Sequence, residues 1–154
     1  MSTYRRMSRM PLFVAATIFM ATGLATEVRA GDVPASAEAA YKEAESLMGG
    51  VPTFMKLYPQ NAVAGAWAEV RDLEFSDQTA LPPKVKALIS LAVAAQIPCN
   101  YCVWADTQTA KQQGATDAEI AEAVAMAGLT RKWSTFFNGM QIDFEQFKKE
   151  LGGE

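Results

Sequence analysis

Residues 83–102 read PKVKALISLAVAAQIPCNYC. The apolar residues ahead of the second proline recur at spacings of three and four and cover more than one face, which predicts a helix packed on several sides. Pro83 suits the first turn of that helix, because the N–H groups there have no acceptor within the helix. Pro98 ends the helix, and a second helix begins at or near Cys99 and Cys102. The stretch therefore predicts two helices that meet at a cysteine pair.

The sequence on either side also favours helices, because no part of it after residue 30 alternates apolar and polar residues with period two. Gly114 offers the left-handed position that ends a helix, and Thr116 with Glu119 forms a capping box that begins the next one. We expect that next helix to bury Ile120, Val124, Ala127 and Leu129. The predicted fold class is all-α, with helices at 35–48, 61–75, 84–97, 99–113 and 143–151 and a short apolar piece at 51–58. A further helix begins at 116, and residues 133–140 either continue it or kink away from it.

Residues 1–30 have the features of a secretory signal peptide. Three arginines lie near the start, an uncharged and mostly apolar stretch follows at 11–24, and small residues occupy the positions that precede cleavage after Ala30. We expect residues 31–154 to form the mature domain and to be exported, either to a periplasm or out of the cell. The alternative is an uncleaved membrane anchor, but the apolar stretch is shorter than the roughly 20 residues that a spanning helix needs.

The composition excludes several classes of function. The chain has 154 residues, enough for one domain, and no histidine. Residues 31–154 carry 10 positive and 16 negative side chains, so nucleic-acid binding lacks its main electrostatic driving force. Without histidine, Ser-His-Asp and Cys-His nucleophile systems, histidine metal sites and imidazole bases are excluded.

The pair Cys99 and Cys102 is the one constellation in the sequence that carries chemistry. A helix start presents free N–H groups and a partial positive charge, which stabilise a thiolate. One alternative is a stabilising disulfide, but a four-residue loop yields only roughly 1.9 kcal/mol of chain-entropy stabilisation against about 3 for a fifteen-residue loop. The other is a zinc site, which lacks its third and fourth ligands unless subunits share it. The spacing favours a redox-active pair.

Three segments resemble the carboxymuconolactone decarboxylase-like family, in particular its alkylhydroperoxidase AhpD-like branch. They are LPPK at 81–84, IPCNYC at 97–102 and GATDAEIAEA at 114–123, and the resemblance extends over about residues 37–151. It implies an all-α AhpD-like fold, a C-x-x-C motif at a helix N-terminus and association of subunits into dimers, trimers or hexamers.

The resemblance also implies roles for the cysteines. In the peroxidase members the second cysteine attacks and the first resolves, which makes Cys102 the nucleophile and Cys99 its partner. Those members relay the proton through a glutamate twelve residues before the first cysteine and a histidine four after the second. Here these positions hold Ala87 and Asp106.

Asp106 is a doubtful base. Proton transfer from a thiol of pKa about 8.5 to imidazole is uphill by roughly 2.7 kcal/mol, whereas transfer to an ordinary aspartate is uphill by about 6.3 kcal/mol. Burial would reduce that gap by raising the aspartate pKa. The alternative is a polar helix residue without a redox role. Lys132 would lower a thiol pKa if it lay near the site, and we expect Trp104 to serve packing.

The sequence thus predicts a thiol-dependent oxidoreductase of the alkylhydroperoxidase type that cycles Cys99 and Cys102 between dithiol and disulfide. Its partners would be a hydroperoxide or disulfide substrate, an external thiol reductant and further copies of itself, with no cofactor, metal or nucleic acid. The alternative from another class is a non-catalytic binding or assembly module with a structural disulfide. Lactone decarboxylation is disfavoured because the sequence offers no acid–base histidine.

Overall fold

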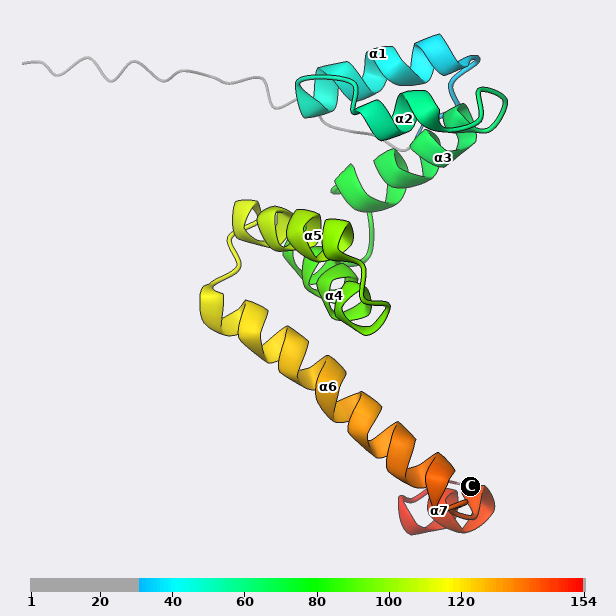
Figure 1. Cartoon of the computed structure of the whole chain (residues 1–154), viewed down its shortest axis with the longest axis vertical. Coiled ribbons are helices and arrows are strands. Elements are labelled where there is room, and N and C mark those ends of the chain that lie inside the picture. The colour runs from blue at the N-terminus through cyan, green and yellow to red at the C-terminus, as the bar shows by residue number, and fades with distance from the viewer. Residues whose placement is uncertain (1–30, 154) are drawn as a thin grey trace, which may run out of the picture.

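The computed structural model describes residues 31–153, which form helices joined by short loops (Figure 1). The signal peptide predicted for residues 1–30 lies outside the described residues. No strand occurs within 31–153, which confirms the all-α prediction. None of the helices in this range combines the length and the apolar character needed to cross a bilayer.

Seven α-helices follow one another along residues 31–153. Their bounds are α1 Ala37–Met48, α2 Thr53–Leu57, α3 Val63–Val70, α4 Pro83–Gln96, α5 Asn100–Gln112, α6 Asp117–Gly139 and α7 Phe144–Glu150. The single helix expected at 61–75 is α3 followed by a π-helical turn, η1 (Arg71–Phe75). Of the continuation or kink predicted at 133–140, the structure shows the continuation, because α6 runs unbroken through residue 133.

A first core lies between α1, α2 and α3. Small residues of α1 let α3 approach closely, and Trp67 of α3 is buried against them. The same carboxylate oxygen of Glu43 accepts hydrogen bonds from Trp67 Nε1 at 3.0 Å and from Arg71 Nη1 at 2.8 Å. Arg71 Nη2 also donates to the carbonyl of Gly31 at 2.7 Å. These bonds tie the first described residues and α1 to the helix that leads toward α4.

Helix α4 is central, as predicted, because it contacts η1, α5 and α6. Its Ala87 packs with Ala110 of α5 and Ala115 in a core of small side chains, on which Leu88 and Ile120 also lie. Alanines at such a contact allow two helices to approach closely. Both η1, which precedes α4 in the chain, and α5, which follows it, therefore pack on α4.

The predicted caps are confirmed. Gly114 has φ +81° at the end of α5. Thr116 Oγ1 accepts from the backbone N–H of Glu119 at 3.1 Å, and a Glu119 carboxylate oxygen accepts from the N–H of Thr116 at 2.7 Å. The other Glu119 oxygen binds Lys84 Nζ at 2.7 Å. Lys84 and the Thr116 N–H together lower the pKa of Glu119 to about 2. This cluster fixes the start of α6 against α4.

The expected burial along α6 is largely wrong. Ile120 packs on the core, but Val124 is 41% and Leu129 is 45% exposed, and no residue of α6 is fully buried. The reason is visible in Figure 1, where α6 extends away from α4 and α5 and carries only α7 at its far end. An apolar face that nothing in the chain covers stays open to solvent.

Candidate redox site

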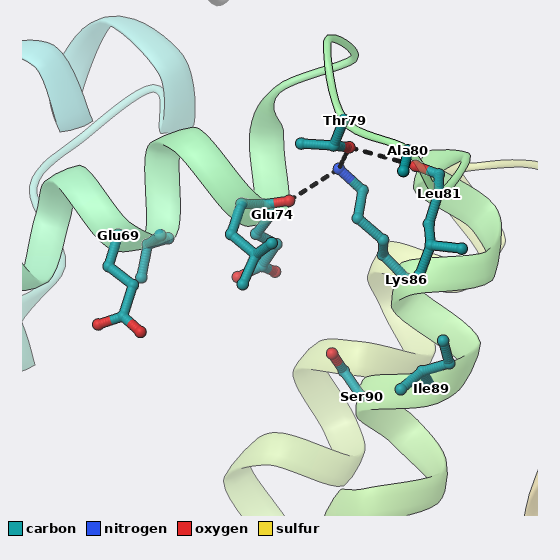
Figure 2. Close-up of a pocket in the computed structure, with 10 residues that line it drawn as sticks. Glu69, Glu74, Thr79, Ala80, Leu81, Lys86, Ile89 and Ser90 are labelled. Atoms are coloured by element: carbon teal, nitrogen blue, oxygen red, sulfur yellow. Dashed lines mark hydrogen bonds between the residues drawn. The ribbon is translucent and has the colours of Figure 1, made fainter. Parts of the chain in front are cut away.

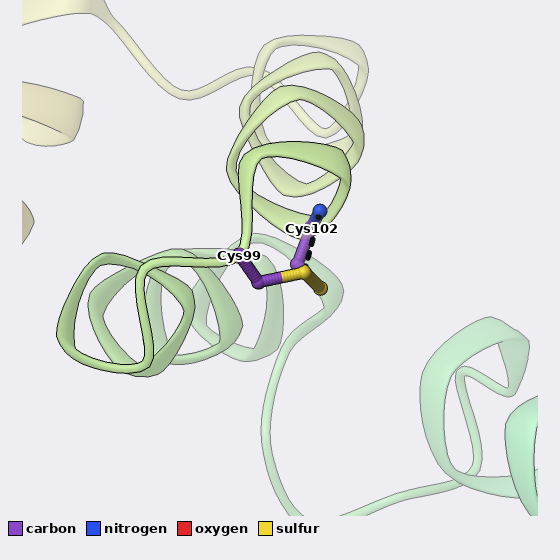
Figure 3. Close-up of a disulfide and its surroundings, with 2 residues drawn as sticks. All are labelled: Cys99 and Cys102. Atoms are coloured by element: carbon purple, nitrogen blue, oxygen red, sulfur yellow. Dashed lines mark hydrogen bonds between the residues drawn. A yellow bond between two sulfur atoms is a disulfide. The ribbon is translucent and has the colours of Figure 1, made fainter.

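Cys99 and Cys102 are joined by a disulfide across the first turn of α5 (Figure 3). Cys99 is the N-cap of this helix, and its Sγ accepts from the backbone N–H of Cys102 at 3.2 Å. Its own N–H donates to the carbonyl of Ala94 at 3.3 Å, which holds the loop against the end of α4. Both cysteines are half-buried. The predicted C-x-x-C pair at a helix N-terminus is therefore confirmed.

The surroundings of the pair favour a thiolate when the disulfide is reduced. The N-terminus of α5 contributes a partial positive charge, and the first turn of the helix carries no acidic residue. A cysteine at such a position has a lowered thiol pKa. The site can therefore supply a nucleophilic sulfur and a second sulfur that closes a disulfide with it.

Asp106 lies one helical turn after Cys102 on the same face of α5 and is half-buried. Burial raises the pKa of its carboxyl above the ordinary aspartate range. This change makes Asp106 a stronger base than an exposed aspartate, because its conjugate acid holds the proton more tightly. The sequence analysis required burial to raise the pKa of Asp106, and the structure shows a shift in that direction.

Replacing Asp106 with asparagine should change how stability depends on pH. A raised pKa in the folded protein favours the protonated carboxyl, so stability falls as the pH rises from the ordinary aspartate value through the raised one. Asp106→Asn removes this loss. The urea midpoint of the variant, relative to that of the unsubstituted protein, should therefore be higher at pH 8 than at pH 4. Glu122→Gln, on an exposed part of α6, is the control. An equal difference at both pH values would contradict the assignment.

Ala87, which occupies the glutamate position of the peroxidase members, offers no space for a longer side chain. It is 5% exposed and packed against Ala110 and Ala115 in the contact between α4 and α5. A glutamate side chain at this position would push α4 and α5 apart. Any second proton-relay group must therefore come from another element.

Ala87→Glu should destabilise the protein instead of restoring a relay. Overpacking a core costs about 1–3 kcal/mol, and an unpaired carboxylate in the same place adds to that cost. Urea denaturation measures the loss, and Ala105→Glu on the exposed side of α5 is the matched control. A variant that keeps its stability within about 0.5 kcal/mol, the range of ordinary surface substitutions, would show that the contact is looser than described.

The structure also shows an acidic residue in a pocket, Glu74, that the sequence analysis did not single out. Glu74 lies on η1 and lines a pocket of about 540 Å³ between η1 and α4. Figure 2 shows its carboxylate and the Ser90 hydroxyl turned toward the same space. Loss of surrounding water and then the charge of Asp106 raise the pKa of Glu74, while Lys86 lowers it. No spacing pattern predicts that Glu74 shares a pocket with Ser90, because a loop and the first part of α4 separate the two residues in the chain.

The structure does not support the expectations for Lys132 and Trp104. Lys132 belongs to the second half of α6, and this half extends away from α4 and α5 (Figure 1). Its ammonium is 5.7 Å from the ring centre of Trp133. Trp104 is 69% exposed, so the expectation that it serves packing is wrong. Within residues 31–153, no three His, Cys, Asp or Glu side chains gather in a way that could hold a metal ion.

Comparison with known proteins agrees with this geometry. Residues 61–143 match the model of the carboxymuconolactone decarboxylase family. The crystal structure of the alkylhydroperoxidase AhpD core from Rhodospirillum rubrum superposes with a TM-score of 0.63 at 26% sequence identity. The match covers 72% of this chain and 85% of that one. No curated protein sequence matches the chain.

Proposed function

Because this chain belongs to the carboxymuconolactone decarboxylase family and is AhpD-like, we propose that it is a thiol-dependent oxidoreductase that reduces hydroperoxides. The observation that carries the proposal is the half-buried Cys99–Cys102 disulfide at the N-terminus of α5, with Asp106 one turn further along. A disulfide is the oxidised end of the proposed cycle, and the helix start favours the thiolate that begins it.

The cycle begins with the reduced pair. The Cys102 thiolate attacks the terminal oxygen of the hydroperoxide, the O–O bond breaks, and the alkoxide leaves and takes up a proton to become an alcohol. Cys102 is then a sulfenic acid. Cys99 attacks its sulfur, the hydroxyl group leaves with a proton as water, and the disulfide forms. An external thiol returns two electrons and two protons, and a disulfide substrate would enter the same cycle through a mixed disulfide.

One experiment tests this function directly. The protein is reduced, freed of reductant and mixed with an organic hydroperoxide. We expect about one equivalent to be consumed per chain, together with the return of the Cys99–Cys102 disulfide, as the chemistry of a single dithiol requires. Hydroperoxide loss no faster than in buffer would refute the proposal.

A second candidate is a non-catalytic module in which the disulfide serves rigidity alone. The closed position of Ala87 favours it, because one relay residue of the peroxidase members has no room there. The reduction potential separates the two candidates. A value near that of glutathione supports redox cycling, whereas a value below about −300 mV supports a structural bridge.

The same proposal includes export and self-association. The pattern in residues 1–30 supports export. In an oxidising compartment outside the cytoplasm, an external thiol would have to reach the protein to reduce the disulfide. Self-association is supported by α6 and α7, whose apolar side chains stay exposed over the length of both helices. These side chains, called here the distal apolar face, are Met126, Leu129, Trp133, Phe136, Met140, Ile142, Phe144 and Leu151.

A second copy of the chain is the proposed occupant of the distal apolar face. Soluble monomers rarely expose continuous apolar surface on this scale, and larger patches mark interfaces. An open pocket of about 720 Å³ on this face is lined by Trp133, Phe137 and Phe147, among others. A further apolar pocket of about 350 Å³ lies where α6 leaves α4. Both pockets would receive side chains of a partner subunit.

A further inference from the structure

We infer that Asp72 forms a binding site for a free amino terminus at Gly31. The site takes up the α-ammonium group that removal of the signal peptide creates, so the processed protein gains a contact that the longer chain lacks. This inference rests on the export that the proposed function includes, because Gly31 becomes the first residue only after cleavage following Ala30.

Arg71, the first residue of η1, organises this site and is 7% exposed. Its Nε donates to Asp72 Oδ1 at 2.6 Å and its Nη2 to Asp72 Oδ2 at 3.1 Å, while Nη1 donates to Glu43 Oε2 at 2.8 Å. Nη2 also donates to the carbonyl oxygens of Gly31 and Asp32, at 2.7 and 3.3 Å. One buried guanidinium group thus holds the backbone of the first described residues beside two carboxylates.

The nitrogen of Gly31 lies close to the Asp72 carboxylate. The Gly31 carbonyl oxygen and Asp72 Oδ2 bind the same nitrogen of Arg71, and the nitrogen of any residue lies within roughly 4 Å of its own carbonyl oxygen. The hydrogen bond from Arg71 lowers the pKa of Asp72, and the Gly31 N–H adds to this effect through a hydrogen bond to the same carboxyl group. In the longer chain the Gly31 nitrogen is a neutral amide. A counter-ion is therefore in place before the charged amino terminus exists.

The charges of the site are unbalanced in the longer chain. Glu43 and Asp72 each carry a negative charge, and Arg71 supplies one positive charge between them. Within residues 31–153, neither carboxylate forms an ion pair with a lysine or with a second arginine. Arg71 repels an ammonium group at Gly31, but the two carboxylates outnumber it, and Asp32 adds a third carboxyl group beside them. A partly buried ion pair of this kind is screened less by salt than one on the open surface.

Cleavage creates the group that binds here by hydrolysis. An export peptidase adds water across the Ala30–Gly31 peptide bond, which leaves a carboxylate on Ala30 and, with the proton that this carboxyl group gives up, an ammonium on Gly31. The ammonium is the main form of an amino terminus at neutral pH. It then donates to the Asp72 carboxylate. No electron is transferred, and water is the only co-reactant.

The test uses the chain expressed with its signal peptide and purified after export. N-terminal sequencing should begin at Gly31. The pKa of the α-amino group is then measured from the pH dependence of its labelling by a trace of acetic anhydride, with the N-terminal peptide quantified by mass spectrometry. We expect a pKa about one unit above the ordinary value of about 8, which is a tenfold shift in proton binding. This readout needs no substituted protein.

Asp72→Asn should return the α-amino pKa to its ordinary value, because the counter-ion is lost. Asp77→Asn is the matched control, since it removes the same charge from the loop after η1, where Asp77 Oδ1 accepts from Gln78 at 2.8 Å. A raised pKa in the folded protein stabilises it below the ordinary value, and this stabilisation is lost as the pH rises through the raised value. The urea midpoint of Asp72→Asn should therefore lie further below that of the unsubstituted protein at pH 6 than at pH 10. Asp77→Asn should show no such dependence.

An ordinary α-amino pKa in a processed protein that begins at Gly31 would overturn the inference and leave export intact. A raised pKa that Asp72→Asn does not change would overturn it as well. A protein that keeps its signal peptide, or that begins at another residue, would refute the predicted cleavage and the inference with it. Hydroperoxide consumption is not measured in this test, so its outcome is independent of the proposed redox cycle.

Discussion

Cys102→Ser should abolish hydroperoxide consumption, with a loss on the order of a thousandfold or more, because it removes the nucleophile of the proposed cycle. Serine at this position keeps the shape of the side chain, but its hydroxyl is a far weaker nucleophile than a thiolate at neutral pH. The measurement is the rate of hydroperoxide loss with reduced protein and excess dithiol, compared with the rate in buffer.

Cys99→Ser is the matched partner of this variant. It should keep the first attack and lose repeated turnover, so that Cys102 accumulates as a sulfenic acid that a dimedone-type reagent traps. Mass spectrometry locates the adduct on the peptide that contains Cys102. The reverse pattern, with an adduct on Cys99 in the Cys102→Ser protein, would exchange the two roles. If both variants consumed hydroperoxide as fast as the unsubstituted protein, the disulfide would have no part in the chemistry.

Trp133→Glu should convert an oligomer into smaller species. The Trp133 ring stacks on that of Phe137 with centres 5.5 Å apart, and the Phe137 ring centre is 5.1 Å from that of Phe147 of α7. Trp133 therefore links the distal apolar face to an aromatic cluster between α6 and α7. Loss of a hot-spot contact in an interface typically costs about 2 kcal/mol or more of binding free energy, which is roughly thirtyfold in the dissociation constant. We expect a charge in place of the Trp133 ring to have an effect of this size. Sedimentation velocity over a range of protein concentrations measures the change.

Thr135→Glu provides the control for this experiment. It adds the same charge two residues away on α6, where Thr135 Oγ1 donates to the carbonyl of Arg131 at 2.9 Å on the other side of the helix. We expect this variant to sediment as the unsubstituted protein does. An unsubstituted protein that is monomeric at tens of micromolar would refute self-association through α6 and α7, since obligate interfaces are much tighter.

Local patterns in the sequence predicted much of what the structure contains. Gly114 and the capping box at Thr116 mark helix ends because a left-handed residue or a side-chain acceptor satisfies backbone groups within a few residues. Pro98 predicted the start of α5 for another local reason, because proline ends the preceding helix. These signals need no knowledge of the rest of the fold.

Burial was harder to predict. The apolar spacing in α6 indicated one covered face, but the sequence does not say whether the cover comes from the same chain or from another. Within the chain only Ile120 reaches the core, while Val124 and Leu129 remain exposed. The same uncertainty applies to Trp104, whose size suggested packing but whose position on α5 leaves it open to solvent.

The sequence by itself determined the helices, their caps and the placement of Cys99 and Cys102 at a helix start, because each depends on interactions within one or two turns. Only the tertiary structure decided that the space around Ala87 is filled and that Glu74 lines a pocket between η1 and α4. Both facts depend on how closely α4 approaches α5 and on where η1 lies against α4. Such distances are set by packing between segments that are far apart in the chain.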